Sequence, residues 1–139
     1  MKKRKKKITV AIDSGAAAGA GTVAKSIANH FNLFYLDTGK IYRFIGKLKI
    51  LNPKKFNYSL IKRKMNSLKV KDLQNKDLLS DKIANSASVI AKDNNIRKLV
   101  RNFQTKYAYN PPKRYKGSIL DGRDIGTVIM KDAMFKFFI

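Results

Sequence analysis

Apolar and polar positions near the start of the chain follow the order strand, loop, helix. Residues Ile8 to Ile12 are β-branched or small, which is typical of a strand covered on both faces. From Val23 onward apolar residues recur at helical spacing, and we expect Val23, Ile27 and Phe31 to face the core. The residues between the two segments are mostly small. The pattern therefore predicts a buried strand, a tight loop and a helix.

Apolar runs and helical stripes continue to alternate along the chain. Ile41, Phe44, Ile45 and Leu48 predict the apolar face of a second helix, which ends at Asn52. The other expected elements are strands at 33–36, 118–120 and 134–139, helices at 81–91 and 95–108, and short helical pieces on a mobile cap at 53–80. This order favours an α/β fold with a doubly wound parallel sheet and helices on both faces.

Two of these segments carry more specific expectations. In the 95–108 helix, Arg97, Arg101 and Gln104 form the polar stripe opposite the apolar one, so we expect them to face away from the core. The run MFKFFI at 134–139 is interpreted as a buried parallel strand that stops with no polar finish and no covering helix. We therefore expect the chain to be a fragment, or a product truncated before its natural end.

Charge is the feature of the composition that changes this picture most. The 139 residues carry a formal net charge of +22, from 31 basic and 9 acidic side chains. Such a charge predicts attraction to polyanions such as nucleic acid, nucleotides or an anionic membrane. Every acid is Asp and most bases are Lys, so we interpret the excess as a compositional bias spread over the surface. Nucleic acid is then expected to bind only non-specifically.

Several classes of protein are excluded by what the sequence lacks. With no cysteine and one histidine, it offers no disulfide framework, no thiol metal site and no His-rich metal site. No apolar run approaches the roughly 20 residues that cross a membrane, and no apolar region follows the basic start as a signal peptide requires. We expect a cytoplasmic protein with no membrane partner and a single α/β core.

The loop after the first strand has the composition of a phosphate-binding loop. Small side chains let successive backbone N–H groups converge on an anion, next to the positive end of the following helix. The candidate ATP phosphate-binding residues are Ser14, Gly15, Ala16, Ala17, Ala18, Gly19, Ala20, Gly21 and Thr22. Ala20 stands where the P-loop pattern has its lysine, and Thr22 is the hydroxyl available for Mg²⁺. Close packing alone is the alternative interpretation.

Three loops follow apolar strands, at 13–22, 36–43 and 121–127. In a doubly wound sheet all three emerge at the carboxyl edge, where ligands bind. Each has an alternative explanation: Asp37 and Thr38 as helix caps, Arg43 as a surface charge, Arg123 with Asp124 as a local ion pair. All three loops nevertheless combine small residues with Arg, Asp or Thr, and together they favour a binding site.

The motifs LDTGKIYR, NSASVIAKDNNIRKLVRNFQTKYA and DGRDIGTVIMKDA make the chain resemble the cytidylate kinases. The resemblance runs from Ile8 to the end and implies a P-loop NTPase-like domain at 8–139 after a basic tail at 1–7. It also implies a small NMP-binding insertion at about 38–110. The implied activity is ATP-dependent phosphoryl transfer to CMP or dCMP, giving the diphosphate, with Mg²⁺ as cofactor.

The resemblance also implies roles for individual residues. The NMP-binding set is Thr38 and Arg43 on the monophosphate side, Ser88 and Arg97 at the nucleotide and its base, Arg123 at the phosphate and Asp124 at the sugar or base. Arg123 is also a candidate catalytic residue. Lys40 is the second one, as a substitute for the lysine missing at Ala20. Lys25 competes for that role, but we expect it to point away from the loop.

Departures from the family pattern keep two alternatives open. Ala20 replaces the loop lysine, Ser14 and Gly15 replace the usual Gly-Pro, and the chain ends before the lid that brings further Arg and Asp residues over the phosphates. Because phosphoryl transfer depends on positioning and charge neutralisation, a non-catalytic nucleotide-binding remnant is one alternative. A basic nucleic-acid-binding protein is the other. CMP versus dCMP preference and oligomeric state stay open.

Overall fold

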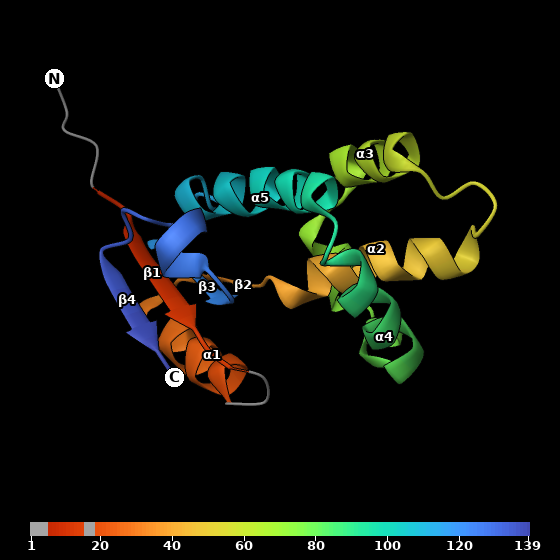
Figure 1. The fold of residues 1–139 in the computed structure, drawn as a ribbon. Coiled ribbons are helices and arrows are strands. Elements are labelled where there is room, and N and C mark those ends of the chain that lie inside the picture. The colour runs from red at the N-terminus through yellow and green to blue at the C-terminus, as the bar shows by residue number, and fades with distance from the viewer. Residues whose placement is uncertain (1–5, 16–18) are drawn as a thin grey trace, which may run out of the picture. The chain divides into compact units, whose positions relative to one another are not determined.

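The computed structural model describes residues 6–15 and 19–139 (Figure 1). Its strands are β1 (Ile8–Asp13), β2 (Phe34–Asp37), β3 (Gly117–Gly122) and β4 (Phe135–Phe138). Its α-helices are α1 (Ala20–Phe31), α2 (Gly39–Leu51), α3 (Tyr58–Ser67), α4 (Asp81–Ile90) and α5 (Asn94–Tyr109). The short turns are η1 (Val70–Gln74) and η2 (Lys76–Leu79), both 3₁₀, and the π-helical η3 (Ile125–Ile129).

The chain forms two compact units. The first contains residues 1–38 and 104–139 and holds the sheet; the second contains residues 39–103 and is helical. No helix in the described part of the chain combines the length and apolar character that a membrane crossing needs.

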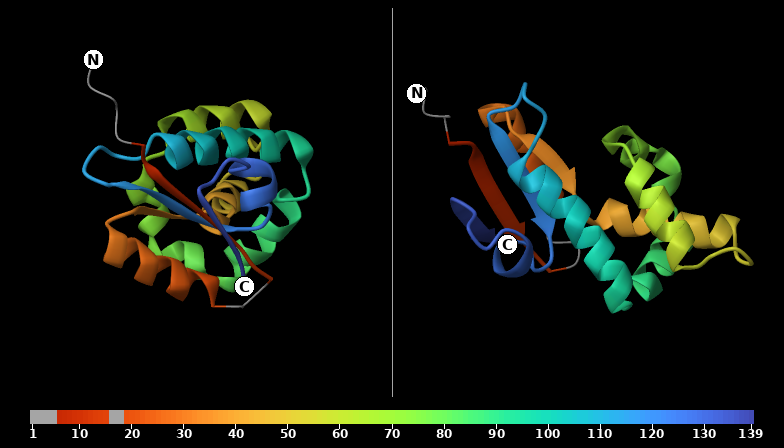
Figure 2. Two further views of the ribbon diagram at one scale, coloured as in Figure 1. Left: turned by 90° about the vertical axis from the view of Figure 1, so that its left-hand side faces the viewer. Right: turned by 90° about the horizontal axis from the view of Figure 1, so that it is seen from above.

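The sheet of the first unit has the order β2-β3-β1-β4, and every pair of neighbours is parallel. Asp13 lies opposite Gly122, and Asp37 lies opposite Asp121. This confirms the predicted α/β fold with a parallel sheet. The loops after β1, β2 and β3 therefore leave from one edge, as the sequence predicted. Figure 2 shows the strands side by side.

Helix α1 packs on this sheet with a different face from the predicted one. Ala20, Ala24 and Ala28 are its buried residues, against a cluster that includes Val10, Ile12 and Ile119. Val23 is 41% exposed and Phe31 52% exposed, so the predicted stripe Val23, Ile27 and Phe31 is wrong, although Ile27 packs at its margin. Alanines let the helix backbone approach the strands closely, whereas larger side chains at the contact would hold it away.

The opposite face of the sheet is covered by η3 and by the end of α5. The ring of Phe34 lies 5.4 Å from that of Tyr107, and the Ser118 hydroxyl donates to the Ala108 carbonyl at 2.5 Å. Gln104 is only 4% exposed, which contradicts its predicted place on the polar stripe. Because α5 passes from the second unit into the first at Gln104, one stripe does not describe its buried side along its whole length.

The second unit is built on a close crossing of α2 and α4. A Cβ on Gly46 would lie 2.9 Å from the backbone nitrogen of Ala87, and the Ser86 hydroxyl donates to the Gly46 carbonyl at 3.0 Å. On the predicted apolar face of α2, Ile41, Ile45 and Leu48 are buried and Phe44 is half-buried. On α4, Ile83, Ala87 and Ile90 are buried. The short helical pieces expected at 53–80 are α3, η1 and η2, which contribute Leu60, Ile61, Met65, Leu73 and Leu78 to the buried set.

Strand β4 forms at the predicted place, but it is exposed. Phe135, Phe137 and Phe138 are 50%, 49% and 84% exposed. β4 is an edge strand whose one neighbour is β1, and residues along it are exposed on both faces. The prediction of a buried strand was therefore wrong, because an apolar run does not distinguish a central strand from an edge strand.

Candidate functional site

The candidate site of the first unit is the carboxyl edge of the sheet, where β1, β2 and β3 end. Each of these strands brings an aspartate to that edge: Asp13, Asp37 and Asp121. The sequence analysis identified the loops at this edge but gave no role to Asp13 or Asp121. An acid that directly ends a buried strand is the signal that identifies both.

Asp13 ties the first loop to the third. Its Oδ1 accepts from the backbone nitrogen of Ile125 at 2.6 Å, and its Oδ2 accepts from that of Gly126 at 3.0 Å. The backbone nitrogen of Ser14 also donates to the Gly122 carbonyl at 3.1 Å. A Cβ on Gly126 would lie 3.2 Å from Asp13 Oδ2, so this close approach favours glycine. The segment DGRDIGT is thereby held against the end of β1.

Thr38 joins the second loop to the third. Its hydroxyl donates to the Asp121 carbonyl at 2.8 Å, and its backbone nitrogen donates to the same oxygen at 3.3 Å. The residue is 4% exposed. Gly122 packs so closely on the Thr38 hydroxyl that a Cβ there would clash. The threonine predicted to meet the monophosphate thus also pins the end of β2 to the end of β3.

Asp121 and Tyr35 form a buried polar pair on the α1 side of the sheet. The Tyr35 hydroxyl lies 3.2 Å from each Asp121 carboxylate oxygen, and Asp121 is 7% exposed. A Cβ on Gly21 would lie 3.4 Å from that hydroxyl and 3.7 Å from Asp121 Oδ2, so the first turn of α1 abuts the pair. Neither residue was a predicted site residue.

Burial governs the protonation of this pair. It raises the pKa of Asp121 to about 6, with a further rise from the charge of Asp37, while the Tyr35 hydrogen bond and the positive charge of Lys25 oppose the rise. Burial, followed by the charges of Asp121 and Asp37, raises the pKa of Tyr35 as well. The charge of Lys25 thus reaches the Asp121 carboxylate, whereas its orientation relative to the loop stays a prediction.

The candidate phosphate loop is described at its two ends. Ser14 is partly buried, Gly15 is exposed, and Gly19 has φ 79° directly before α1 begins. The predicted residues Ala16, Ala17 and Ala18 lie outside the described residues. Ala20, at the position of the missing lysine, is 7% exposed and belongs to the apolar cluster under α1.

A magnesium site was tested against the side chains at the start of α1. Thr22 is exposed there. Within 6–15 and 19–139, no group of three or more His, Cys, Asp or Glu side chains is placed to hold a metal ion. Mg²⁺ typically takes one or two protein ligands and completes its shell with water and substrate phosphates. A single hydroxyl next to a phosphate loop fits that use.

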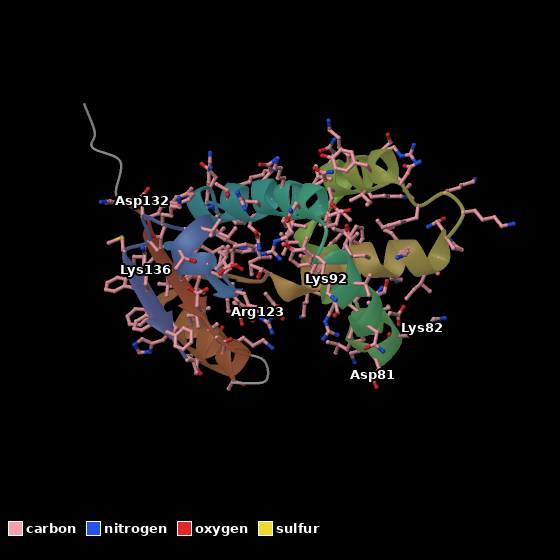
Figure 3. The ribbon with its side chains drawn as sticks, viewed as in Figure 1. Asp81, Lys82, Lys92, Arg123, Asp132 and Lys136 are labelled. Atoms are coloured by element: carbon pink, nitrogen blue, oxygen red, sulfur yellow. The ribbon has the colours of Figure 1, made fainter. Side chains whose placement is uncertain are left out.

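Arg123 and Asp124 form the turn between β3 and η3, and both are exposed (Figure 3 labels Arg123). Asp124 has φ 57°, and its carbonyl accepts from the backbone nitrogens of Val128 and Ile129. This left-handed residue turns the chain from the strand into η3. Arg123 directly precedes it at the carboxyl edge of the sheet.

The other predicted site residues belong to the second unit. Lys40 is partly buried in the first turn of α2, and Ser88 is exposed on α4. Arg43 Nη1 donates to the Leu78 carbonyl at 2.9 Å, and Arg97 Nη1 donates to the Ala91 carbonyl at 3.0 Å. Each arginine thus has a structural contact within its unit, and a guanidinium has five N–H donors. Their roles toward a nucleotide stay predictions.

Comparisons with known proteins identify relatives over most of the chain. The family model described as cytidylate kinase matches residues 10–139. The cytidylate kinase of Paramagnetospirillum magneticum is 41% identical over 131 residues, which cover 94% of this chain and 62% of that protein. That of Azorhizobium caulinodans is 37% identical over 130 residues, 94% of this chain and 61% of that protein. That of Clostridium botulinum is 35% identical over 144 residues, 95% of this chain and 64% of that protein.

Proposed function

This chain belongs to the cytidylate kinase family, and we propose that it transfers a phosphoryl group from ATP to CMP or dCMP. The chain spans 62% of the length of the first of these relatives, so the activity of the whole protein is part of the proposal. The observation that carries it is the polar edge of the parallel sheet, where three strand ends are tied together by Asp13 and Thr38. Ligands of open α/β sheets bind at such an edge. We assign the reaction to the cytoplasm.

In this proposal the loop from Ser14 to Thr22 holds the ATP phosphates. Left-handed Gly19 and the exposed Thr22 in the first turn of α1 support it, because backbone N–H groups and the helix dipole attract anions there. The Thr22 hydroxyl would ligate Mg²⁺, which supplies charge neutralisation of the phosphates when bound. Exposure of Thr22 at the first turn supports that assignment.

Roles toward CMP or dCMP are proposed for each unit separately. In the first unit, Arg123 binds the phosphate, and Asp124 accepts from the sugar hydroxyls or from the exocyclic amine of the base. An Arg fork and a carboxylate suit these partners. Thr38, also in the first unit, is proposed for the monophosphate side. In the second unit, Arg43 is proposed for the monophosphate side, and Ser88 and Arg97 for the nucleotide and its base. Arg123 supports this assignment best, because it is exposed next to the tied loops.

Lys40 is proposed as the cation that takes over from the lysine absent at Ala20. Its place in the first turn of α2, two residues after Thr38, supports this role, since helix N-termini favour anions. Its ammonium would act as a flexible point charge on the transferred phosphoryl group. Arg123 is the second charge in this mechanism.

Ala20 supports a second candidate function, nucleotide binding without turnover. It is buried among apolar side chains at the lysine position, so the loop itself contributes no side-chain cation there. Backbone N–H groups and Arg123 still offer phosphate contacts. Tight CMP binding with no release of ADP would select this function.

The test measures ADP release from ATP, CMP and Mg²⁺ in a coupled assay. Turnover is expected, and Lys40→Ala should lower kcat by about a hundredfold or more, the usual effect of removing one charge-stabilising group. Lys25→Ala is the matched variant and should lower kcat far less. Equal or negligible effects of the two substitutions would refute the role of Lys40.

A further inference from the structure

The second unit contains a basic groove that none of the proposed nucleotide contacts uses. Two adjoining cavities, of about 540 and 590 Å³, lie along the second half of α2. They share Leu48, Leu51 and Lys64 in their walls, so they lie next to each other on one surface. We call this surface the α2–α3 groove; α3 and the residues leading into it line one end, and η1 lines the other.

The floor of the groove is a stripe of α2. Phe44, Lys47, Leu48, Leu51 and Asn52 follow one another at helical spacing along it. From the first to the last, this stripe runs roughly 12 Å at the helical rise. Leu51 is 63% exposed, so the floor offers apolar surface to a ligand. A ligand that fits has apolar or aromatic faces and is longer than one small anion.

Positive charge dominates the walls. Lys47, Lys55, Arg63, Lys64 and Lys71 line the groove, against a single acid, Asp72. Asp72 Oδ2 already accepts from the backbone nitrogen of Lys69 at 2.9 Å, and Lys47 pairs with Asp77 outside the groove at 3.5 Å.

The remaining four basic side chains, Lys55, Arg63, Lys64 and Lys71, have no hydrogen bond or ion pair to another described residue. Uncompensated cations gathered in a concave surface repel one another and raise the local positive potential. An anionic ligand relieves that repulsion. A chain of phosphates does so at several of the four positions together.

We propose that the α2–α3 groove binds single-stranded nucleic acid without sequence preference. The basic side chains contact successive phosphates, and the bases lie on Phe44 and Leu51. Single-strand sites combine a basic groove with apolar or aromatic platforms in this way. A concave surface of this kind does not suit a flat membrane. The proposal is independent of the kinase function.

The test uses fluorescence anisotropy of a labelled oligouridylate of about 12 nucleotides, within the range of single-strand sites. The groove variant combines Lys55→Gln, Arg63→Gln, Lys64→Gln and Lys71→Gln. The control variant combines Lys82→Gln, Lys92→Gln, Lys98→Gln and Arg101→Gln, which are exposed residues of the same unit outside both cavities. Figure 3 labels two of them, Lys82 and Lys92. Both variants replace three lysines and one arginine, so their net charges are equal.

Wild type should bind, with an affinity that falls steeply between roughly 50 and 200 mM salt. The groove variant should lose about tenfold or more in affinity, and its salt slope should be shallower by about 2.8, or 0.7 for each of four lost contacts. The control variant should change little. Equal weakening by both variants would show general charge attraction and overturn the proposal, as would absence of binding by wild type.

Two further measurements complete the test. Binding to anionic phospholipid vesicles without binding to the oligouridylate overturns the proposal in favour of a membrane partner. If circular dichroism shows that the fourfold variant is unfolded, Lys64→Gln with Lys71→Gln is compared in its place with Lys82→Gln and Lys92→Gln. CMP affinity, measured on the same proteins, should be unchanged, so failure here is distinguishable from failure of the kinase proposal.

Discussion

Carboxylates serve different purposes in the two units. In the helical unit two exposed carboxylates cap helices: Asp93 Oδ1 accepts from the backbone nitrogens of Asn95 and Ile96 at the start of α5, and Asp72 closes the turn of η1. In the sheet unit, Asp13 and Asp121 lie at strand ends and bind groups that are distant in sequence. Acids in this very basic chain thus cap helices in one unit and tie strand ends and loops together at the carboxyl edge of the sheet in the other.

The difference between the two units is tested most strongly by replacing one acid that ties loops together and one acid that caps a helix. Asp13→Ala leaves two backbone amides without their charged acceptor, and it should destabilise the protein by roughly 3 to 6 kcal/mol, from two bonds to a charged group. Asp93→Ala removes only a helix cap and should cost about 1 kcal/mol. Urea unfolding measures both. Similar losses of unfolding free energy in the two variants would show that Asp13 contributes no more than a helix cap does.

Asp121 should make the free energy of unfolding depend on pH, which the exposed acids of the helical unit should not do to the same extent. Its folded-state pKa of about 6 is above the ordinary 3.8, so the folded state holds its proton more tightly than the unfolded state. The protonated Asp121 carboxyl therefore contributes its full stabilisation to the folded state below about pH 4. As pH rises toward 6 this contribution is lost, and the free energy of unfolding falls by about 3 kcal/mol in total. Asp121→Asn should abolish this part of the pH dependence of the unfolding free energy. If the unfolding free energy of Asp121→Asn varied with pH as that of wild type does, the raised pKa of Asp121 would be contradicted.

Tyr35 should have a smaller effect, in a direction that the hydrogen bond dictates. Its hydroxyl donates to the Asp121 carboxylate and favours the charged form, so Tyr35→Phe should raise the pKa of Asp121 further. Loss of this bond should cost about 1 kcal/mol near neutral pH. NMR titration of the Asp121 carboxyl carbon measures the shift, with Tyr58→Phe, at an exposed tyrosine of α3, as control. A lowered pKa would show that the hydroxyl does not bind the carboxylate.

Local patterns were sufficient to predict much of the fold. A run of β-branched and small residues predicted β1, a short segment at 118–120 predicted β3, and helical spacing predicted the apolar face of α2. The face of α1 was wrong because large side chains dominate an apolar pattern, whereas the contact with the sheet is made by Ala20, Ala24 and Ala28. The exposure of β4 was missed because strand order is set by long-range pairing that no local run encodes.

The candidate site shows the same division. Placing the three loops at one edge followed from the alternation of strands and helices along the chain, and the parallel sheet confirms it. The ties within that edge could not be predicted, because Asp13 and Ile125 are 112 residues apart and Tyr35 and Asp121 are 86 apart. Which backbone groups an acid meets at such separations depends on the folded register.

The most direct test of the central claim, that the tied carboxyl edge binds the nucleotide monophosphate, is calorimetric titration of CMP into wild type and Arg123→Ala. Arg123 is exposed beside the loops that Asp13 and Thr38 hold together. Loss of its bond to a charged phosphate should weaken CMP binding by on the order of 1.5 to 3 kcal/mol, which is about tenfold or more. Lys131→Ala, an exposed charge just after η3, should bind CMP as wild type does. Unchanged affinity in Arg123→Ala would contradict the account.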